Sequence, residues 1–146
     1  MQDMQVTELP EAPATKIRTK AIINLPLGLL GFEQIKQYNL LARPEDEPFM
    51  WLQRLDDCKQ GFLVISPSEC AFSYQPDLHP DDVTFLKLHA PDDALVLNIV
   101  TLRGANQATV NLKGPIVVNR LTLIGKQVVP VNAASYSVQH PLPVAP

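Results

Sequence analysis

Two cysteines and two histidines are the side chains in this sequence best suited to hold a metal ion or to act as nucleophile and base: Cys58, Cys70, His79 and His89. Eleven, eight and nine residues lie between them in turn, whereas structural zinc sites are built from closely spaced pairs. A cysteine nucleophile with a histidine base remains an alternative, but no nucleophile elbow or oxyanion-type glycine turn accompanies it. The phosphate-binding glycine loop, the dinucleotide fingerprint and the HExxH motif are all missing. The sequence therefore predicts no metal site, no cofactor and no catalysis.

The charged residues indicate which partners the protein can bind. Its formal net charge is −3, and the lysines and arginines do not form the cluster that phosphate binding requires. We therefore expect no direct binding of nucleic acid. Acidic residues instead occur in short groups, whose natural complement is a basic protein surface. The groups are Glu45, Asp46 and Glu47; Asp56 and Asp57; Asp81 and Asp82; and Asp92 and Asp93.

A mainly β structure must position these side chains. Apolar and β-branched runs between turn-forming stretches predict strands at 16–25, 38–42, 49–55, 61–66, 94–103, 108–113, 115–119, 121–131 and 135–139. One short helical turn is expected at 32–37, and Pro80, followed by two aspartates, predicts the start of a helix. So many strand edges must be paired or covered that we expect a small antiparallel β-barrel-like domain, or a closed sandwich, with one or two short helices.

The chain of 146 residues fits one domain, which we place at 16–142. Residues 1–15 are mostly polar or small and are expected to form a flexible arm. The proline-containing stretch HPLPVAP (140–146) is expected to leave the sheet, with 143–146 as a tail. No stretch reaches the roughly 20 apolar residues of a membrane helix, and the first residues lack the order of a signal peptide. We expect a cytoplasmic protein with free thiols.

The stretch ATVNLKGPIVVN (108–119) places a Gly-Pro break inside a strand-forming run. Because proline cannot donate to a neighbouring strand, Gly114 and Pro115 predict a bulge or a sharp bend, where a strand leaves one sheet and joins another. A bend leaves backbone groups unpaired, and asparagine carries both a donor and an acceptor on a short side chain. Asn111 and Asn119, on either side of the break, are therefore expected to be braces.

Several motifs, taken in order, resemble the flagellar assembly factor FliW family. The bend stretch is followed by GKQVV, which contains Gln127, and then by YSV. PLGLLGFE (26–33), with Gly28 and Gly31, is similar to the family's Gly-Leu-Pro-Gly-Phe-Glu turn, and PFMWLQRLDDCKQGFLVISP (48–67) resembles its tryptophan segment. The likeness runs from about residue 16 to 142. Leu30 stands where the family usually has proline, Gly114 where it has alanine, and Pro130 where its last apolar strand continues.

This resemblance implies a non-catalytic, barrel-like binding protein that is a monomer when free and that has two alternative partners. One partner is flagellin, the exported filament subunit. The other is CsrA, a small basic RNA-binding homodimer that represses flagellin translation, and binding to it would relieve that repression. The runner-up hypothesis is a small β-barrel that binds an apolar small molecule in its interior.

The contact residues are expected in two places. Leu29, Leu30 and Phe32 lie in a loop between glycines, where a core does not obviously demand them, and they are our candidates for an apolar flagellin contact. The alternative for Phe32 is that it plugs one end of the barrel. The candidates for the CsrA contact are Asp46, Glu47, Asp56 and Asp57.

Overall fold

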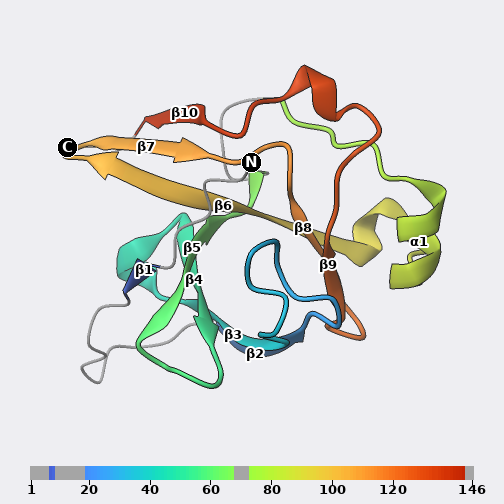
Figure 1. Ribbon diagram of the computed structural model, residues 1–146, viewed down its shortest axis with the longest axis horizontal. Coiled ribbons are helices and arrows are strands. Elements are labelled where there is room, and N and C mark those ends of the chain that lie inside the picture. The colour runs from blue at the N-terminus through green and yellow to red at the C-terminus, as the bar shows by residue number, and fades with distance from the viewer. Residues whose placement is uncertain (1–6, 9–18, 68–72, 144–146) are drawn as a thin grey trace.

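Antiparallel strands dominate the computed structural model, which describes residues 7–8, 19–67 and 73–143 (Figure 1). The strands are β1 (Thr7–Glu8), β2 (Thr19–Asn24), β3 (Gln37–Ala42), β4 (Phe49–Arg54), β5 (Gln60–Ile65), β6 (Ala94–Gly104), β7 (Gln107–Val110), β8 (Ile116–Asn119), β9 (Gly125–Gln127) and β10 (His140–Pro143). One α-helix, α1 (Pro80–Leu86), and 3-10 turns at η1 (Pro44–Asp46), η3 (Pro91–Asp93) and η4 (Ala133–Ser135) complete the described part. The prediction of a mainly β antiparallel fold with a short helix beginning at Pro80 is confirmed.

The strands form one meander with a branch. Their hydrogen-bonded order is β10-β7-β6-β5-β4-β3-β2, and β8 and β9 branch from the first half of β6. A parallel bridge between Asn24 and Ile124 brings the end of β2 beside the start of β9. The eleven-residue β6 is therefore the common spine of the fold, as its length in Figure 1 shows.

The Gly-Pro break lies between β7 and β8, two strands that pair with different halves of β6. The second half of β6 pairs with β7, from Val100 opposite Val110 onward, whereas its first half pairs with β8, with Leu97 opposite Ile116. The chain between Val110 and Ile116 forms no strand. The expected bend, at which a strand leaves one sheet and joins another, is confirmed.

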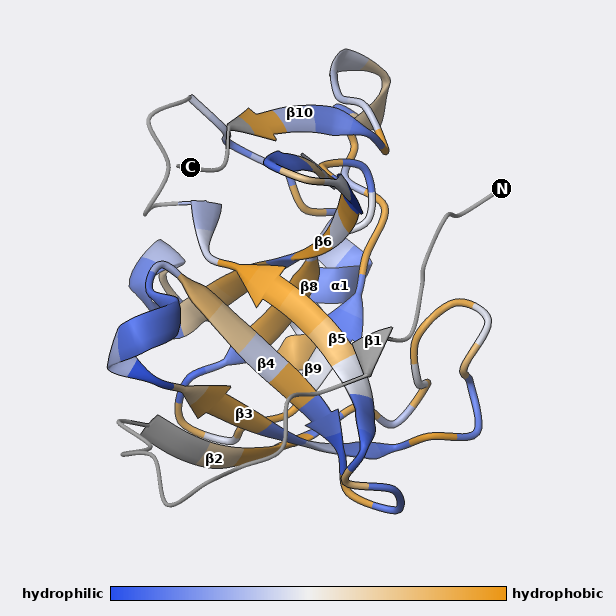
Figure 2. Cartoon of the chain, turned by 90° about the vertical axis from the view of Figure 1, so that its left-hand side faces the viewer, coloured by the Kyte–Doolittle hydropathy of each residue, from blue (hydrophilic) through white to orange (hydrophobic). Residues whose placement is uncertain are grey.

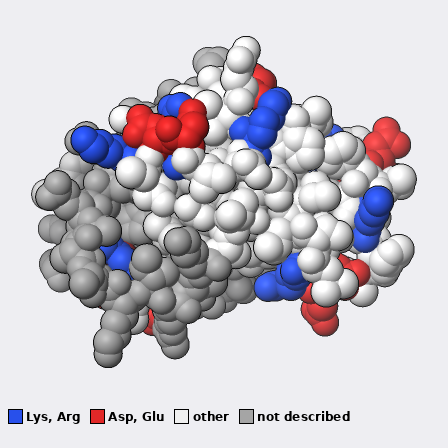
Figure 3. All heavy atoms as spheres, turned by 90° about the horizontal axis from the view of Figure 1, so that it is seen from below, with Lys and Arg blue, Asp and Glu red and all other residues white. Residues whose placement is uncertain are grey.

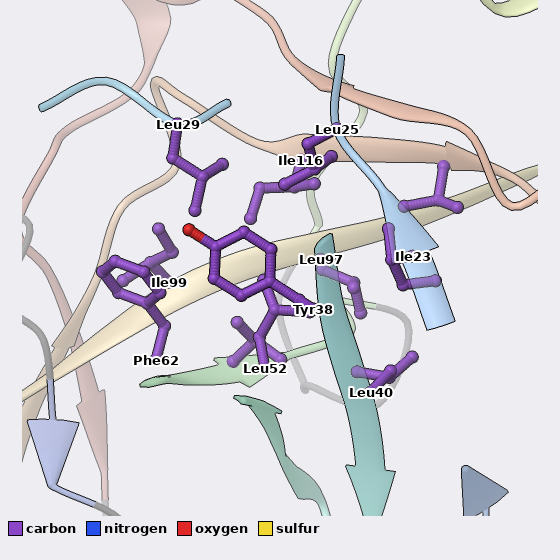
Figure 4. Packing of buried hydrophobic residues seen from close by; sticks show 12 residues of the cluster. Ile23, Leu25, Leu29, Tyr38, Leu40, Leu52, Phe62, Leu97, Ile99 and Ile116 are labelled. Atoms are coloured by element: carbon purple, nitrogen blue, oxygen red, sulfur yellow. The ribbon is translucent and has the colours of Figure 1, made fainter. Parts of the chain in front are cut away.

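The core is divided between the two faces of this curved sheet. The largest cluster lies inside the curve and includes side chains from β2 to β6 and β8. Figure 4 shows Tyr38, Phe62 and Leu52 facing Leu25 and Leu29 across this interior, so side chains fill the space that the small-molecule hypothesis would assign to a ligand. In β8 the alternation of side chains sends Ile116 and Val118 into this cluster and Val117 to the opposite face, beneath α1.

Strand β5 shows why a continuous apolar run can be a strand. It is paired with β4 on one side and with β6 on the other, and its residues from Gly61 to Ile65 are buried. Figure 2 shows it as the most uniformly apolar strand in view. Both faces are covered, because Val64 packs in the interior cluster and Leu63 in a second cluster with Val110 and Leu142.

Three local predictions at the C-terminal side are wrong. Residues 135–139 form no strand, and residues 140–143, expected to leave the sheet, form β10 against β7. Pro141 and Pro143 are tolerated because β10 is an edge strand, and prolines two residues apart turn their missing N–H groups to the same, unpaired side. Only Gly125–Gln127 of the expected strand 121–131 forms a strand, although Ile124 makes a single bridge to Asn24. Residues 32–37, where one short helical turn is expected, contain a single hydrogen-bonded turn, Ile35 N to Phe32 O at 3.1 Å.

The N-terminal arm is described only at Thr7–Glu8. These two residues are not a free arm, because they pair with Gly61 and Gln60 of β5 as strand β1. On this side of β5, β6 pairs only from Leu63 onward. The start of β5 is therefore open to β1. The remainder of the predicted arm, together with tail residues 144–146 and Cys70, lies outside the described residues. None of the helices in the described ranges is long and apolar enough to cross a membrane.

Candidate partner-binding surface

The loop between β2 and β3 is a tight, internally hydrogen-bonded structure. Leu25 N donates to Lys36 O at 2.7 Å and closes the base of the loop, while Phe32 N donates to Leu29 O at 2.7 Å across its tip. Gly28 and Gly31 have φ angles of +69° and +88°, which side chains other than glycine rarely adopt. A Cβ atom at Gly28 would lie 2.5 Å from Glu33 Cα. The path of the loop therefore requires glycine at both positions, which belong to the motif PLGLLGFE.

The three apolar candidates in this loop have different surroundings. Leu29 is 1% exposed and belongs to the interior cluster, so it offers no surface to a partner. Phe32 is half-buried and packs edge-on against Phe62, with 5.3 Å between ring centroids. Leu30 is 47% exposed, and Leu27, which the sequence reasoning did not select, is 54% exposed. The accessible apolar pair of the loop is thus Leu27 and Leu30.

The side chain of Gln127, on β9, holds the backbone of the loop at Leu30. Leu30 N donates to Gln127 Oε1 at 2.9 Å, and Gln127 Nε2 donates to Gly114 O at 3.1 Å. Gln127 lies 97 residues from Leu30 in sequence, and its one amide side chain joins the loop to the Gly-Pro bend. Because both backbone groups are fixed to a strand, Leu30 is presented on a rigid support.

The two asparagines hold the chain at the two ends of β8: Asn111 holds the Gly-Pro bend, and Asn119 holds the β8–β9 turn and not the bend that the sequence had suggested. Asn111 Oδ1 accepts hydrogen bonds from Lys113 N and Gly114 N, both at 3.0 Å. Asn119 Oδ1 accepts from Leu121 N and Thr122 N, and its Nδ2 donates to Leu86 O at 2.8 Å, at the end of α1. Both side chains are buried. They satisfy backbone groups that the strands leave unpaired.

The acidic candidates do not form one surface. Asp46 and Glu47 precede β4, and Asp56 and Asp57 follow it. A strand of six residues separates the two pairs by roughly 20 Å. On the face drawn in Figure 3, acidic side chains gather near its two ends, and basic ones are scattered singly.

Two of these four acids also bind side chains of their own chain. Asp46 accepts hydrogen bonds from Arg43 Nε at 2.5 Å and from Trp51 Nε1 at 3.0 Å. Asp56 is bound by both Nε and Nη2 of Arg54, at 3.0 and 2.9 Å, and these hydrogen bonds lower its pKa. Glu47 and Asp57 are exposed. Asp56 is exposed as well, so Asp46 is the least accessible of the four.

The cysteine and histidine candidates lie on separate elements. Cys58 is exposed in the turn between β4 and β5, whereas His79 precedes α1 and His89 follows it. No group of three metal-ligating side chains occurs within the described ranges, from which Cys70 is missing.

Comparison with known proteins gives one consistent family. A sequence model of the FliW protein family matches residues 10–142. The chain is 33% identical over 141 residues to the flagellar assembly factor FliW of Natranaerobius thermophilus, covering 95% of this chain and 92% of the relative. It is 35% identical to the FliW protein of Clostridium botulinum strain Langeland, covering 84% and 86% of the two chains.

A solved structure shares the fold as well as the sequence. The crystal structure of the flagellar assembly factor FliW superposes with a TM-score of 0.71 at 32% identity, over 82% of this chain and 83% of the other. The matched range 10–142 of the family model includes the loop, the bend and β9 described above. The chain therefore belongs to the FliW family of non-catalytic flagellar assembly factors.

Proposed function

We propose that this protein binds flagellin in the cytoplasm, as a monomer, and that it alternatively binds CsrA and relieves repression of flagellin synthesis. Family membership supports a role in flagellar assembly. The proposal that the protein binds flagellin rests on one observation. Leu27 and Leu30 are exposed on a loop whose backbone is bound by Gln127.

The chemistry of an unassembled filament subunit explains why such a pair is useful. Its terminal segments form amphipathic helices that pack only against neighbours in the filament, so a holding factor must cover an apolar stripe. An exposed leucine on a rigid loop loses little conformational entropy when it is buried by a partner, which favours binding. Leu30 is accordingly the contact that we place at the centre of the interface.

A binding titration with flagellin tests this proposal. Changing Leu30 to Asp is expected to weaken flagellin binding by on the order of 1 kcal/mol or more, because it puts a charge at a central apolar contact. The backbone bond of residue 30 to Gln127 does not use the side chain, so the melting temperature should stay unchanged. Isothermal titration calorimetry and thermal unfolding measure the two quantities.

Leu102→Asp is the matched control, because Leu102 is 55% exposed and lies in the second half of β6, opposite Ala108 of β7. Normal flagellin binding by a folded Leu30→Asp variant would remove the loop from the interface. The same titration with CsrA in place of flagellin tests the second partner, and no saturable binding would contradict that half of the proposal. The acids Asp46, Glu47, Asp56 and Asp57 remain the proposed contacts for it.

A further inference from the structure

A second candidate surface lies on the opposite face of the β6–β8–β9 sheet from the Leu30 loop. A groove of about 480 Å³ opens there beside α1. Its apolar lining includes five half-buried side chains, Leu78, Val83, Leu88, Ala94 and Val96. Four of these side chains pack on the buried cluster of Leu86, Val117 and Val128, which faces away from the interior that contains Leu29. The groove is therefore an incompletely covered apolar surface, separate from the flagellin loop.

The walls of the groove are fixed by hydrogen bonds. On one side, Asp77 N donates to Asn132 Oδ1 at 2.9 Å, and Val131 N donates to Asp77 O at 2.6 Å. On the other side, His89 N and Ala90 N donate to Asp93 Oδ2 at 2.8 and 2.9 Å, which lowers the pKa of Asp93. The floor is the start of β6. A groove with fixed walls needs no rearrangement to receive a partner.

The charge around the groove is concentrated and negative. Residues 76–96 contain five aspartates and one lysine, a formal charge of −4 in a chain whose total is −3. Asp82 is held by Lys126, and Asp93 by the two backbone amides. Asp77, Asp81 and Asp92 are exposed and have no ion-pair partner among the described residues.

We propose that this groove binds a lysine- or arginine-flanked apolar segment of a protein partner, with aliphatic side chains against Val83, Ala94 and Val96 and cations beside Asp77 and Asp92. Asp77 is itself part of the lining, whereas Asp92 follows the lining residue Pro91 on the facing wall. An apolar row between two acidic walls is complementary to an amphipathic segment with basic edges. This inference does not depend on the identity of the partner of the Leu30 loop.

A fluorescence anisotropy titration with a fluorescein-labelled amphipathic peptide of leucine and lysine tests the proposal. We expect saturable binding that weakens as salt is raised, and no comparable binding of the same peptide with glutamate in place of lysine. Ala94→Trp fills the groove and should weaken binding about tenfold or more. The double variant Asp77→Asn, Asp92→Asn should weaken binding and flatten its dependence on salt.

Two controls locate the effect. Asp57→Asn removes an exposed acid in the β4–β5 turn, and Leu30→Asp changes the other candidate surface, so neither should alter binding of this peptide. Amide chemical shifts of the unaltered protein, followed by NMR as peptide is added, should change first at the groove residues; this measurement stands even if Ala94→Trp fails to fold. The proposal is overturned if no saturable binding occurs, if the glutamate peptide or an uncharged apolar dye binds as tightly, or if the shifts map elsewhere.

Discussion

Asn111 and Asn119 each hold backbone amides where no strand partner is available. The Oδ1 atom of each accepts from two successive amides, at residues 113 and 114 for Asn111 and at residues 121 and 122 for Asn119. This is the local side-chain to backbone bonding for which asparagine is suited. Asn119 additionally reaches Leu86 O, and it thereby ties the β8–β9 turn to the end of α1.

Replacing Asn111 with Ala is expected to lower the free energy of unfolding by about 1 to 3 kcal/mol, because Lys113 N and Gly114 N lose their acceptor in a buried position. Chemical denaturation followed by circular dichroism measures the change. Gln34→Ala, at an exposed loop position, is the control and should leave stability within error. Unchanged stability of Asn111→Ala together with lost partner binding would instead make Asn111 a recognition residue.

At the scale of elements, the loop of residues 25–36 depends on two glycines for different reasons. Both have positive φ, but Gly28 also lies against the backbone of Glu33, whereas no atom lies within 4 Å of a Cβ atom built on Gly31. Gly31 N donates to Glu33 Oε2 at 3.0 Å, which lowers the pKa of Glu33. The path of the loop is thus set by the backbone, and the exposed leucines are carried on it.

Gly31→Ala is expected to cost about 1 to 2 kcal/mol, the strain of a left-handed conformation without a clash. Gly28→Ala should cost clearly more, because the backbone of Glu33 must also move away from the new methyl group. Urea denaturation of the two variants gives the comparison, with each variant serving as the control for the other. Equal losses for the two would show that the close approach at Gly28 relaxes easily.

At the scale of the whole molecule, the buried Tyr38 and the half-buried Tyr74 make the stability of the fold depend on pH in the alkaline range. Burial raises the pKa of Tyr38 and of Tyr74 to about 12, from an ordinary value of 10.0. Tyr38 lies in the interior cluster, and Tyr74 donates to Leu112 O at 2.7 Å beside the bend. The fold favours the protonated phenol at both places, so this contribution is fully present below about pH 10.

The melting temperature is therefore expected to fall as pH rises from about 10 to 12, because the unfolded chain releases phenolic protons that the folded chain retains. Differential scanning calorimetry across this range measures the fall. Tyr38→Phe removes one of the two ionisations and should make the fall shallower; its hydroxyl has no hydrogen-bond partner among the described residues. A melting temperature that stays level through this range would contradict the expectation.

The sequence by itself determined the elements whose signals are local. The strands β3, β4, β5 and β6 follow apolar runs between turn residues, and α1 begins at the proline followed by acids. The Gly-Pro dipeptide in a strand-forming run predicted the change of sheet, because proline lacks the N–H group that a strand paired on both sides needs. The order of these motifs also pointed to the family that the comparisons show.

Only the tertiary structure decided what depends on residues distant in the chain. Leu29 and Leu30 are neighbours in one apolar loop, yet the first is core and the second is exposed, because Gln127 fixes the backbone at Leu30 from β9. The prolines of β10 are compatible with a strand only because β10 pairs with β7 on one side and, among the described residues, has no strand on its other side. Arg43 binds Asp46 and Arg54 binds Asp56, so acids that look alike in the sequence differ in their contacts. Exposure, edges and pairing are properties of the folded chain, and local sequence does not contain them.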